Sequence, residues 1–466
     1  MSAPARRRHP HAPGKKTAEA IQQEVAQEVS RLVGVIFRGR RHGGPLDLEA
    51  VETATRSAMH RAGAAVLSPL LSSPEAVPHE APCPCGQQAR YHDTRPKQLL
   101  TALGAVEFQR AYYLCPHCQR GQCPRDAELD VAGCACSPGV RRMMALVGSE
   151  TSFEQGREQL EVLAGLQVTA KAVERHAEAL GADIAAREQA EIQRAKQLEL
   201  PEIRSLPAPV LYIEMDGTGV PVVAAETAGR AGKTPGRPAR TREVKLGCVF
   251  TQTTTDEKGR PLRDKNATSY TGAIEGAEAF GLRLYTEAWR RGWSRAKKKV
   301  VIGDGALWIW NLAHQHFPGA VEIVDLYHAR QHLWELSAKL FPNDERGRER
   351  WTARLLDTLE RGKIEALVNV LRAFPSPGED LAHLLAKEAD YFERNTARMR
   401  YPEFREQDLF VGSGVVEAGC KSVIGARLKR SGMFWTVRGA NAILALRCCR
   451  RNGRFEDYWE ARSTAA

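Results

Sequence analysis

Three acidic residues in the second half of the chain have a type and a placement that suit divalent-metal chemistry. Asp216 follows the apolar run Val210–Met215. Asp304 follows the run Val300–Gly303 in the same way, and Glu417 lies later in a helical pattern. Functional side chains gather at strand ends in open α/β sheets, so both aspartates are expected at one sheet edge. Three carboxylates can hold two Mg²⁺ ions about 3.5–4 Å apart, an arrangement that supports in-line phosphoryl transfer.

Four cysteines in the first half have the spacing of a structural metal site. Cys83 and Cys85 form one tight pair, and Cys115 and Cys118 form a second pair after a β-type stretch. Two such pairs at the ends of a hairpin bring four thiolates around one tetrahedral Zn²⁺, so a zinc ribbon is expected. The N-terminus has no apolar leader, which predicts a reducing compartment and metal binding rather than disulfides. The alternative zinc ligands nearby are His117, Cys123, Cys134 and Cys136.

The composition and the breaks in pattern predict a soluble protein of several domains. The 466 residues are 43% hydrophobic and 26% charged, and no apolar run reaches the roughly 20 residues of a membrane span. Proline and glycine clusters separate the segments. The expected order is a disordered basic arm at 1–16, a helical region at 17–80, a zinc-ribbon-like domain at 81–136, a helix-turn-helix region at 140–200, the first part of a catalytic domain at 208–328, a helical insertion at 329–400 and the second catalytic part at 401–466.

Residues 153–181 fit a helix-turn-helix. Gly165 breaks the first helix, Thr169 is placed to cap the second, and Gly181 is placed to end it. Lys171 and Arg175 would then face outward on a candidate recognition helix. Any helical hairpin has the same pattern, so DNA reading by this segment stays open.

The catalytic segment is expected to be an α/β domain built on a mixed sheet. Apolar runs alternate there with helical patterns and end in turn residues. The expected strands are Val210–Met215, Val244–Thr251, Thr268–Thr271, Val300–Gly303 and Ala320–Val324. Helices are expected at Glu275–Arg291, Ala306–His316, Gly412–Gly425 and Ala440–Arg450.

Four motifs in this order resemble those of bacterial insertion-sequence transposases. They are MDGTGVP (Met215–Pro221), GDGALWIWN (Gly303–Asn311), DLYHARQHL (Asp325–Leu333) and SGVVEAGCKSVIGARLKRSGMFW (Ser413–Trp435). The resemblance is to the DDE enzymes of the Kra-four-type group, which are distantly similar to Mutator-type transposases. It implies an RNase H-like fold with an all-α insertion, and Asp216, Asp304 and Glu417 as the catalytic, metal-binding triad. Two Mg²⁺ or Mn²⁺ ions would serve DNA strand cleavage and transfer.

Asp325 and His328 are expected to support this site. The pair matches the Asp/Cys-x-x-His motif that precedes the insertion in Mutator-like enzymes, which implies a role at the active site or the DNA beside it. Asp325 is also the rival of Asp304 as second metal ligand. We prefer Asp304, because it ends the fourth strand and Asp325 ends the fifth. An N-capping Asp325 beside a packed histidine is the structural alternative.

The charge balance favours an anionic partner. Lys and Arg outnumber Asp and Glu by 67 to 56, a net charge of +11. Many DDE enzymes carry a cation where this chain has Ile424, so Lys421 or Arg427 is expected to contact phosphate instead. Trp308 and Trp310 suit the core. The expected DNA contacts are Lys171, Arg175, Arg237, Arg240, Arg427, Lys429, Arg430 and, by stacking on a base, Trp435.

The sequence thus predicts a transposase that cuts and joins strands at the ends of an insertion sequence. Its partners would be double-stranded DNA, both terminal repeats and target, and further copies of itself in a homodimer or larger complex. Its location would be the cytoplasm, at the nucleoid. The alternatives are an RNase H-like nuclease that does not join strands and an inactive DNA-binding regulator. A zinc hydrolase is disfavoured, because thiolate-only zinc sites are usually closed and structural.

Overall fold

A computed structural model describes residues 18–40, 47–72, 77–203, 206–232, 236–375 and 378–463. The basic arm expected at 1–16 lies outside these residues. The chain divides into two compact units, one made of Met1–Ala177 with Trp459–Ala466 and the other of Glu178–Tyr458. The end of the chain therefore groups with the first unit, although 401–466 was expected to belong wholly to the catalytic part. Arg462 explains this grouping, because it forms an ion pair with Asp130.

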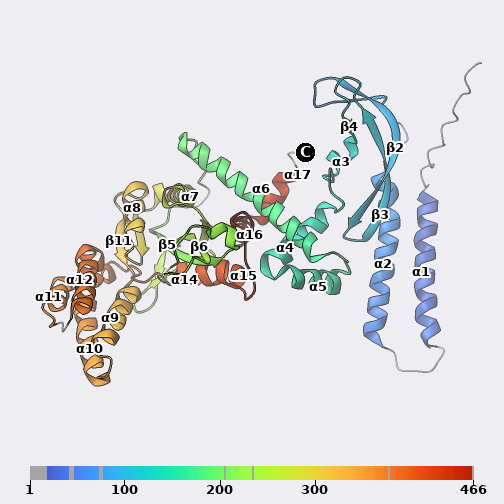
Figure 1. The fold of residues 1–466 in the computed structure, drawn as a ribbon. Helices are drawn as coiled ribbons and strands as arrows, with labels where there is room; N and C mark the ends of the chain where they lie inside the picture. The colour runs from blue at the N-terminus through green and yellow to red at the C-terminus, as the bar shows by residue number, and fades with distance from the viewer. Residues whose placement is uncertain are drawn as a thin grey trace, which may run out of the picture. The chain divides into compact units, whose positions relative to one another are not determined.

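The first unit opens with two helices and a small antiparallel sheet. The helices are α1 (Ala18–Arg40) and α2 (Leu48–Leu71), and the sheet has the order β1-β2-β3-β4. Its strands are β1 (Glu80–Pro82), β2 (Gln88–Thr101), β3 (Gly104–Leu114) and β4 (Gly121–Gln122). Figure 1 shows β2 and β3 as a long hairpin beside α2. Phe108 and Val106 of β3 are buried there against Leu67 and Ala64 of α2.

Three further helices follow the short α3 (Pro124–Glu128): α4 (Pro138–Glu150), α5 (Phe153–Ala164) and α6 (Ala170–Lys196). Gly165 ends α5 in a left-handed conformation, and the Thr169 hydroxyl accepts the N–H of Ala172 at 3.0 Å. The prediction that a helix ends at Gly181 is wrong, because α6 continues to Lys196. Gly181 instead lies against the backbone carbonyl of Ala442, where any side chain would clash.

The second unit is built on a five-stranded mixed sheet with the order β11-β10-β5-β6-β9. Its strands are β5 (Val210–Pro221), β6 (Thr241–Gln252), β9 (Ser269–Ala273), β10 (Lys298–Gly303) and β11 (Val321–Val324). β5, β6 and β9 are antiparallel, whereas β10 and β11 run parallel to β5. A separate pair, β7 (Thr254–Thr255) and β8 (Pro261–Leu262), follows β6.

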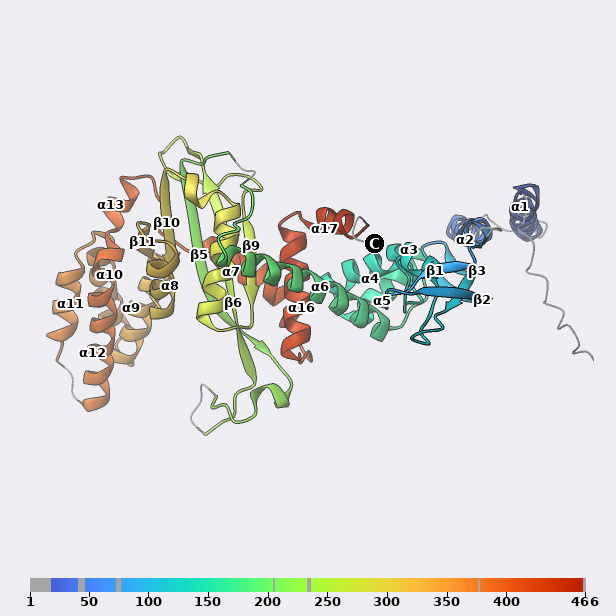
Figure 2. The ribbon, with the colours of Figure 1, turned by 90° about the horizontal axis from the view of Figure 1, so that it is seen from above.

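Helices cover this sheet and extend it at one side. α7 (Ala277–Arg290), the short η2 (Trp293–Arg295) and α8 (Leu307–His316) connect the strands. After β11 come α9 (Leu326–Leu340), α10 (Glu345–Glu360), α11 (Ile364–Arg372), α12 (Glu379–Arg394), η3 (Thr396–Met399) and α13 (Tyr401–Arg405). Figure 2 shows α9 to α13 gathered beside the β10–β11 edge. The region expected to be a helical insertion is therefore helical.

The last part of the chain returns to the sheet. It comprises α14 (Gly414–Gly419), a π-helical turn η4 (Cys420–Gly425), α15 (Ala426–Leu428), α16 (Val437–Arg451) and α17 (Phe455–Ser463). The buried guanidinium of Arg447 donates to the carbonyl oxygens of Ser422 and Val423, each at 2.6 Å. These bonds stabilise the π-helical turn, a distortion that often marks functional sites in helices.

Candidate metal centre and carboxylate site

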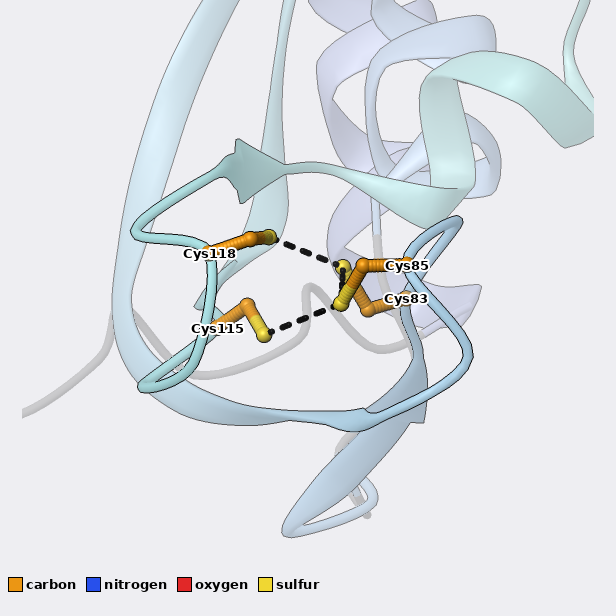
Figure 3. A group of neighbouring side chains, drawn as sticks. All are labelled: Cys83, Cys85, Cys115 and Cys118. Carbon is orange, nitrogen blue, oxygen red and sulfur yellow. Dashed lines mark hydrogen bonds between the residues drawn. The ribbon is translucent and has the colours of Figure 1, made fainter.

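The four cysteines predicted to bind zinc lie together at one end of the β1–β4 sheet (Figure 3). The Cys83 and Cys85 sulfurs are 3.4 Å apart, Cys83 and Cys118 are 3.6 Å apart, and Cys85 and Cys115 are 3.7 Å apart. Each pair occupies a tight turn between two strands, closed by backbone bonds such as Gly86 N–H to the Cys83 carbonyl. This set could hold a structural Zn²⁺.

The thiolate chemistry of the cluster favours a cation. The backbone amides of Cys118 and His117 lower the pKa of Cys115 to about 6, because they donate hydrogen bonds to its thiolate. All four sulfurs lie within 4.8 Å of one another. The alternative ligands Cys123, Cys134, Cys136 and His117 are not members of this group within the described residues.

Strand register brings Asp216 and Asp304 side by side. β5 and β10 are parallel, with Ile302 paired to Glu214. Asp216 and Asp304 each follow two residues beyond this last pair, on adjacent strands. Burial raises the pKa of Asp216, and the charge of Asp304 raises it further. The two carboxyl groups therefore share one local environment at this sheet edge.

The Asp-Gly pair predicted that the strand ends at Asp216, but the strand continues past this residue. β5 runs on to Pro221, where it pairs with Thr241 of β6. Only the parallel pairing with β10 stops, at Glu214. Asp216 thus lies at the opening between β5 and β10 while β6 still supports its backbone. Its carboxylate accepts the N–H of Gly217 at 2.6 Å.

Two contacts connect the helix of Glu417 to β5. The carboxylate of the buried Glu214 accepts the N–H of Val416 at 2.7 Å. One turn along the same helical segment, the Cys420 thiol lies 3.3 Å from an Asp216 oxygen. Glu417, between these contacts, is exposed, and its charge acts on both Glu214 and Cys420. The helix therefore carries Glu417 next to Asp216, with its carboxylate toward solvent.

Glu214 is a candidate site residue that the sequence reasoning missed. Its side chain is fully buried, and one carboxylate oxygen has no hydrogen-bond partner among the described residues. Burial and the charges of Asp325 and Glu417 raise its pKa to about 8, so it is mostly protonated at neutral pH. An acid in the middle of the apolar run before Asp216 was the available signal, because alternate strand residues share one face.

Asp325 already uses both carboxylate oxygens. Oδ1 accepts the N–H of Tyr327 at 2.9 Å and so caps α9, and Oδ2 accepts the Ser413 hydroxyl at 2.6 Å. The side chain is 2% exposed. Asp304 is partly exposed, and its Oδ1 accepts the N–H of Ala306 at 2.9 Å. This difference favours the preference for Asp304 over Asp325 as a ligand.

The carboxylates are more widely spaced than the thiolates. Within the described residues, only the cysteines form a group of three or more candidate ligands within 4.8 Å of one another. Asp216, Asp304 and Glu417 do not form such a group. The charge of Asp304 disfavours ionisation of Asp216, and a bridging divalent cation would relieve that repulsion. Oxygen ligands with open space suit Mg²⁺ or Mn²⁺.

Two of the residues predicted to contact DNA are buried. Trp435 is 5% exposed, and its indole N–H donates to the Leu428 carbonyl at 3.1 Å. Arg427 is fully buried beside the Trp435 ring, with one guanidinium nitrogen 3.2 Å from the Met433 sulfur. Direct DNA contact by these two was therefore a wrong prediction. Their loop is tied to the β5–β6 hairpin, where Trp435 bridges Val222.

The other predicted DNA contacts are at least partly accessible. Lys429 is exposed and bonded to the Thr218 hydroxyl, two residues beyond Asp216. The exposed aromatic ring of this loop is Phe434, at 64%, rather than its neighbour Trp435. Trp310 lies in the core at 2%, as predicted. Exposed or partly exposed are Lys171, Arg175, Arg237, Arg240, Lys421, Arg430 and His328.

Comparison with known proteins places the chain in a family. The model of an uncharacterised protein family, UPF0236, matches residues 44–462. The chain belongs to this family. A "UPF0236 protein in vanSb 3'region" from Streptococcus gallolyticus is 23% identical over 381 residues, 78% of this chain and 74% of that protein.

The chain also has a weak match among solved structures. It is the "Drosophila P element transposase strand transfer complex", with a TM-score of 0.24 and 8% identity over 69% of this chain and 79% of that chain. A likeness this weak carries no conclusion about fold or function. Among the described helices, none is long and apolar enough to cross a membrane.

Proposed function

We propose that this UPF0236 protein is a DDE transposase that cleaves DNA strands at the ends of an insertion sequence and joins them to target DNA. The observation that carries the proposal is the sheet edge where Asp216 and Asp304 lie side by side and the Glu417 helix is tied to β5. The strand order β11-β10-β5-β6-β9, with β5 to β9 antiparallel, supports an RNase H-like assignment.

Asp216, Asp304 and Glu417 would hold two Mg²⁺ ions at this edge. Bound there, the ions would activate the attacking oxygen and stabilise the leaving oxygen of an in-line displacement. Glu214 holds the backbone of the Glu417 helix and stays uncharged, so it adds no further repulsion. Lys429, exposed beyond Asp216, supplies a cation for a DNA phosphate.

The first unit would recognise the DNA ends. A Zn²⁺ held by Cys83, Cys85, Cys115 and Cys118 would stabilise the β1–β4 sheet. The helices α5 and α6 have the capped turn of a helix-turn-helix, and Lys171 and Arg175 lie on α6. Action on two DNA ends requires at least two copies in the active complex.

The test is a strand cleavage and joining assay on labelled duplexes that carry the ends of the element, with Mg²⁺ or Mn²⁺. We expect Asp216→Asn, Asp304→Asn and Glu417→Gln each to lose at least about a thousandfold in cleavage, since each removes a ligand worth several kcal/mol in the transition state. DNA binding should survive. The matched control is Asp380→Asn, which neutralises an exposed acid of α12 in the same unit.

Other outcomes select the alternatives. Cleavage without joining by the wild type would identify a nuclease. Binding without cleavage under either metal would identify a regulator. Loss of cleavage in Asp325→Asn, with Asp304→Asn still active, would make Asp325 the second ligand.

A further inference from the structure

The helical region after β11 touches the turn that carries Asp304. Tyr391 of α12 donates its hydroxyl hydrogen to the backbone carbonyl of Asp304 at 2.9 Å. The tyrosine is only 9% exposed. Its ring lies so close to the turn that a side chain on Gly305 would come within 2.6 Å of it. Gly305 also has a φ of +94°, which favours glycine, so the turn and the tyrosine fit each other closely.

Two residues hold the Tyr391 ring in place. The His332 ring of α9 stacks on it, with centroids 4.1 Å apart and an interplanar angle of 12°. His332 Nδ1 is in turn 2.7 Å from an oxygen of Glu388, which lies on α12 one turn before Tyr391. His332 also makes an edge-to-face contact with His328, with centroids 4.9 Å apart. Glu388, His332 and Tyr391 therefore form one packed unit across two helices.

We propose that the helical region positions the metal-binding Asp304 through Tyr391, and that His332 and Glu388 fix the tyrosine for this task. The inference rests on the proposed function and adds three positioning residues to it. It gives the helices after β11 a role at the reaction centre besides any contact with DNA.

The chemistry of the contact supports this role. Asp304 follows the last residue of β10, where backbone pairing to β5 has stopped. Repulsion from Asp216 would displace an unsupported turn, and a shift of about 1 Å at a metal ligand is enough to weaken a site. The Tyr391 hydroxyl donates to the Asp304 carbonyl and so supports the turn from outside the sheet. Because this bond fixes the carbonyl, the backbone of the Asp304 turn stays in place. The Asp304 side chain then keeps its direction.

The test measures Mn²⁺ affinity by calorimetric titration of the full chain, purified with its zinc. Tyr391→Phe removes the hydroxyl and keeps the ring. We expect Mn²⁺ binding to weaken about three- to tenfold, the usual effect of one hydrogen bond. The apparent Mg²⁺ requirement for cleavage should rise by a similar factor, while the melting temperature and DNA affinity stay close to the wild type.

Tyr401→Phe is the matched control. Tyr401 is a fully buried tyrosine of the same helical region, and its hydroxyl has no hydrogen-bond partner within the described residues. This variant should leave Mn²⁺ affinity unchanged. Glu388→Ala should reproduce the Tyr391→Phe defect, because His332 loses its partner. Glu388→Gln, which keeps an acceptor for His332, should restore most of the affinity.

Equal Mn²⁺ affinity in Tyr391→Phe and the wild type would overturn the inference, as would an equal defect in Tyr401→Phe. These results would leave the proposed function standing if the wild type cleaves DNA. Conversely, a wild type that binds Mn²⁺ at Asp304 but never cuts would refute the function, and the affinity series would still judge the positioning role.

Discussion

The two candidate metal sites of this protein differ in how completely the fold assembles them. The four cysteines lie within 4.8 Å of one another, on turns that each contribute two ligands. The three carboxylates come from β5, the end of β10 and α14, and they do not reach that spacing. A closed set of ligands suits a structural ion, whereas an open set leaves room for substrate oxygens.

The difference also has an electrostatic side. Backbone amides lower the pKa of Cys115 to about 6, which prepares a thiolate for metal. At the carboxylate edge, burial and neighbouring acids raise the pKa of Asp216 and Glu214 instead. Burial and the neighbouring thiols also raise the pKa of Cys83 to about 12, so both sites need a cation to hold all their ligands charged.

The largest effect should follow loss of the thiolate site. Cys115→Ala should abolish zinc binding and unfold the β1–β4 sheet, since a structural zinc contributes on the order of 10 kcal/mol to such small domains. Zinc content by mass spectrometry and amide hydrogen exchange in β2 and β3 would measure this. Amides of β5 and β6 should keep their protection. Cys134→Ala is the control, and a zinc-free variant with protected β2 amides would contradict the prediction.

A smaller effect should follow the neutralisation of Glu214. Its pKa is about 8 in the fold against an ordinary value of 4.5. The folded state therefore holds a proton that the unfolded state has lost, and stability falls as pH rises from 4.5 to 8, then levels off. The slope would be at most about 1.4 kcal/mol per pH unit. Glu214→Gln should remove it, as urea denaturation across this pH range can show; identical pH profiles would refute the account.

Substitutions of Asp325 and Asp304 should differ in their effect on stability as well as on activity. Asp325→Ala removes the cap of α9 and the bond to Ser413, so we expect about 1–2 kcal/mol of destabilisation. Asp304→Asn should change the free energy of unfolding little without added metal. Denaturant titrations of both variants compare the two effects directly. Equal destabilisation would mean that Asp304 is structural too.

The smallest effect concerns phosphate contact at the carboxylate edge. Lys429→Ala should reduce the slope of log affinity against log salt by about 0.9, the loss of one phosphate contact. The exposed Lys258, in the loop between β7 and β8, provides the control. Filter binding or anisotropy at several salt concentrations measures the slope. An unchanged slope in Lys429→Ala would mean that the DNA lies elsewhere on this face.

Local pattern was sufficient for features that depend on neighbours in sequence. The capping Thr169 and the left-handed Gly165 follow from turn chemistry that a few residues determine. Four of the five strands of the mixed sheet were recognised from apolar runs and the one near Thr268–Thr271 from its β-type residues, although β5 and β6 proved longer than expected. Pairing partners extended both strands, and no local pattern reports a partner.

Side-chain exposure was harder to predict, because it depends on what packs from elsewhere in the chain. Trp435 and Arg427 lie in a basic stretch that suggested contact with DNA, yet both are buried. Gly181 had the place of a helix end but serves a close approach to Ala442. Trp435 pairs with Val222, and Gly181 lies against Ala442. Both partners are far away in sequence, so no local pattern indicates these contacts.

The sequence by itself determined the types and the order of the chemical groups: paired cysteines across a hairpin, and acids after apolar runs. Those features are local, since spacing of a few residues decides which side chains share a turn or a strand face. Only the tertiary structure decided which acids lie near one another. Strand register set Asp216 beside Asp304, a buried Glu214 joined β5 to the Glu417 helix, and α12 brought Tyr391 to the Asp304 turn. These contacts join residues that are far apart in sequence, and they form only when the whole unit packs together.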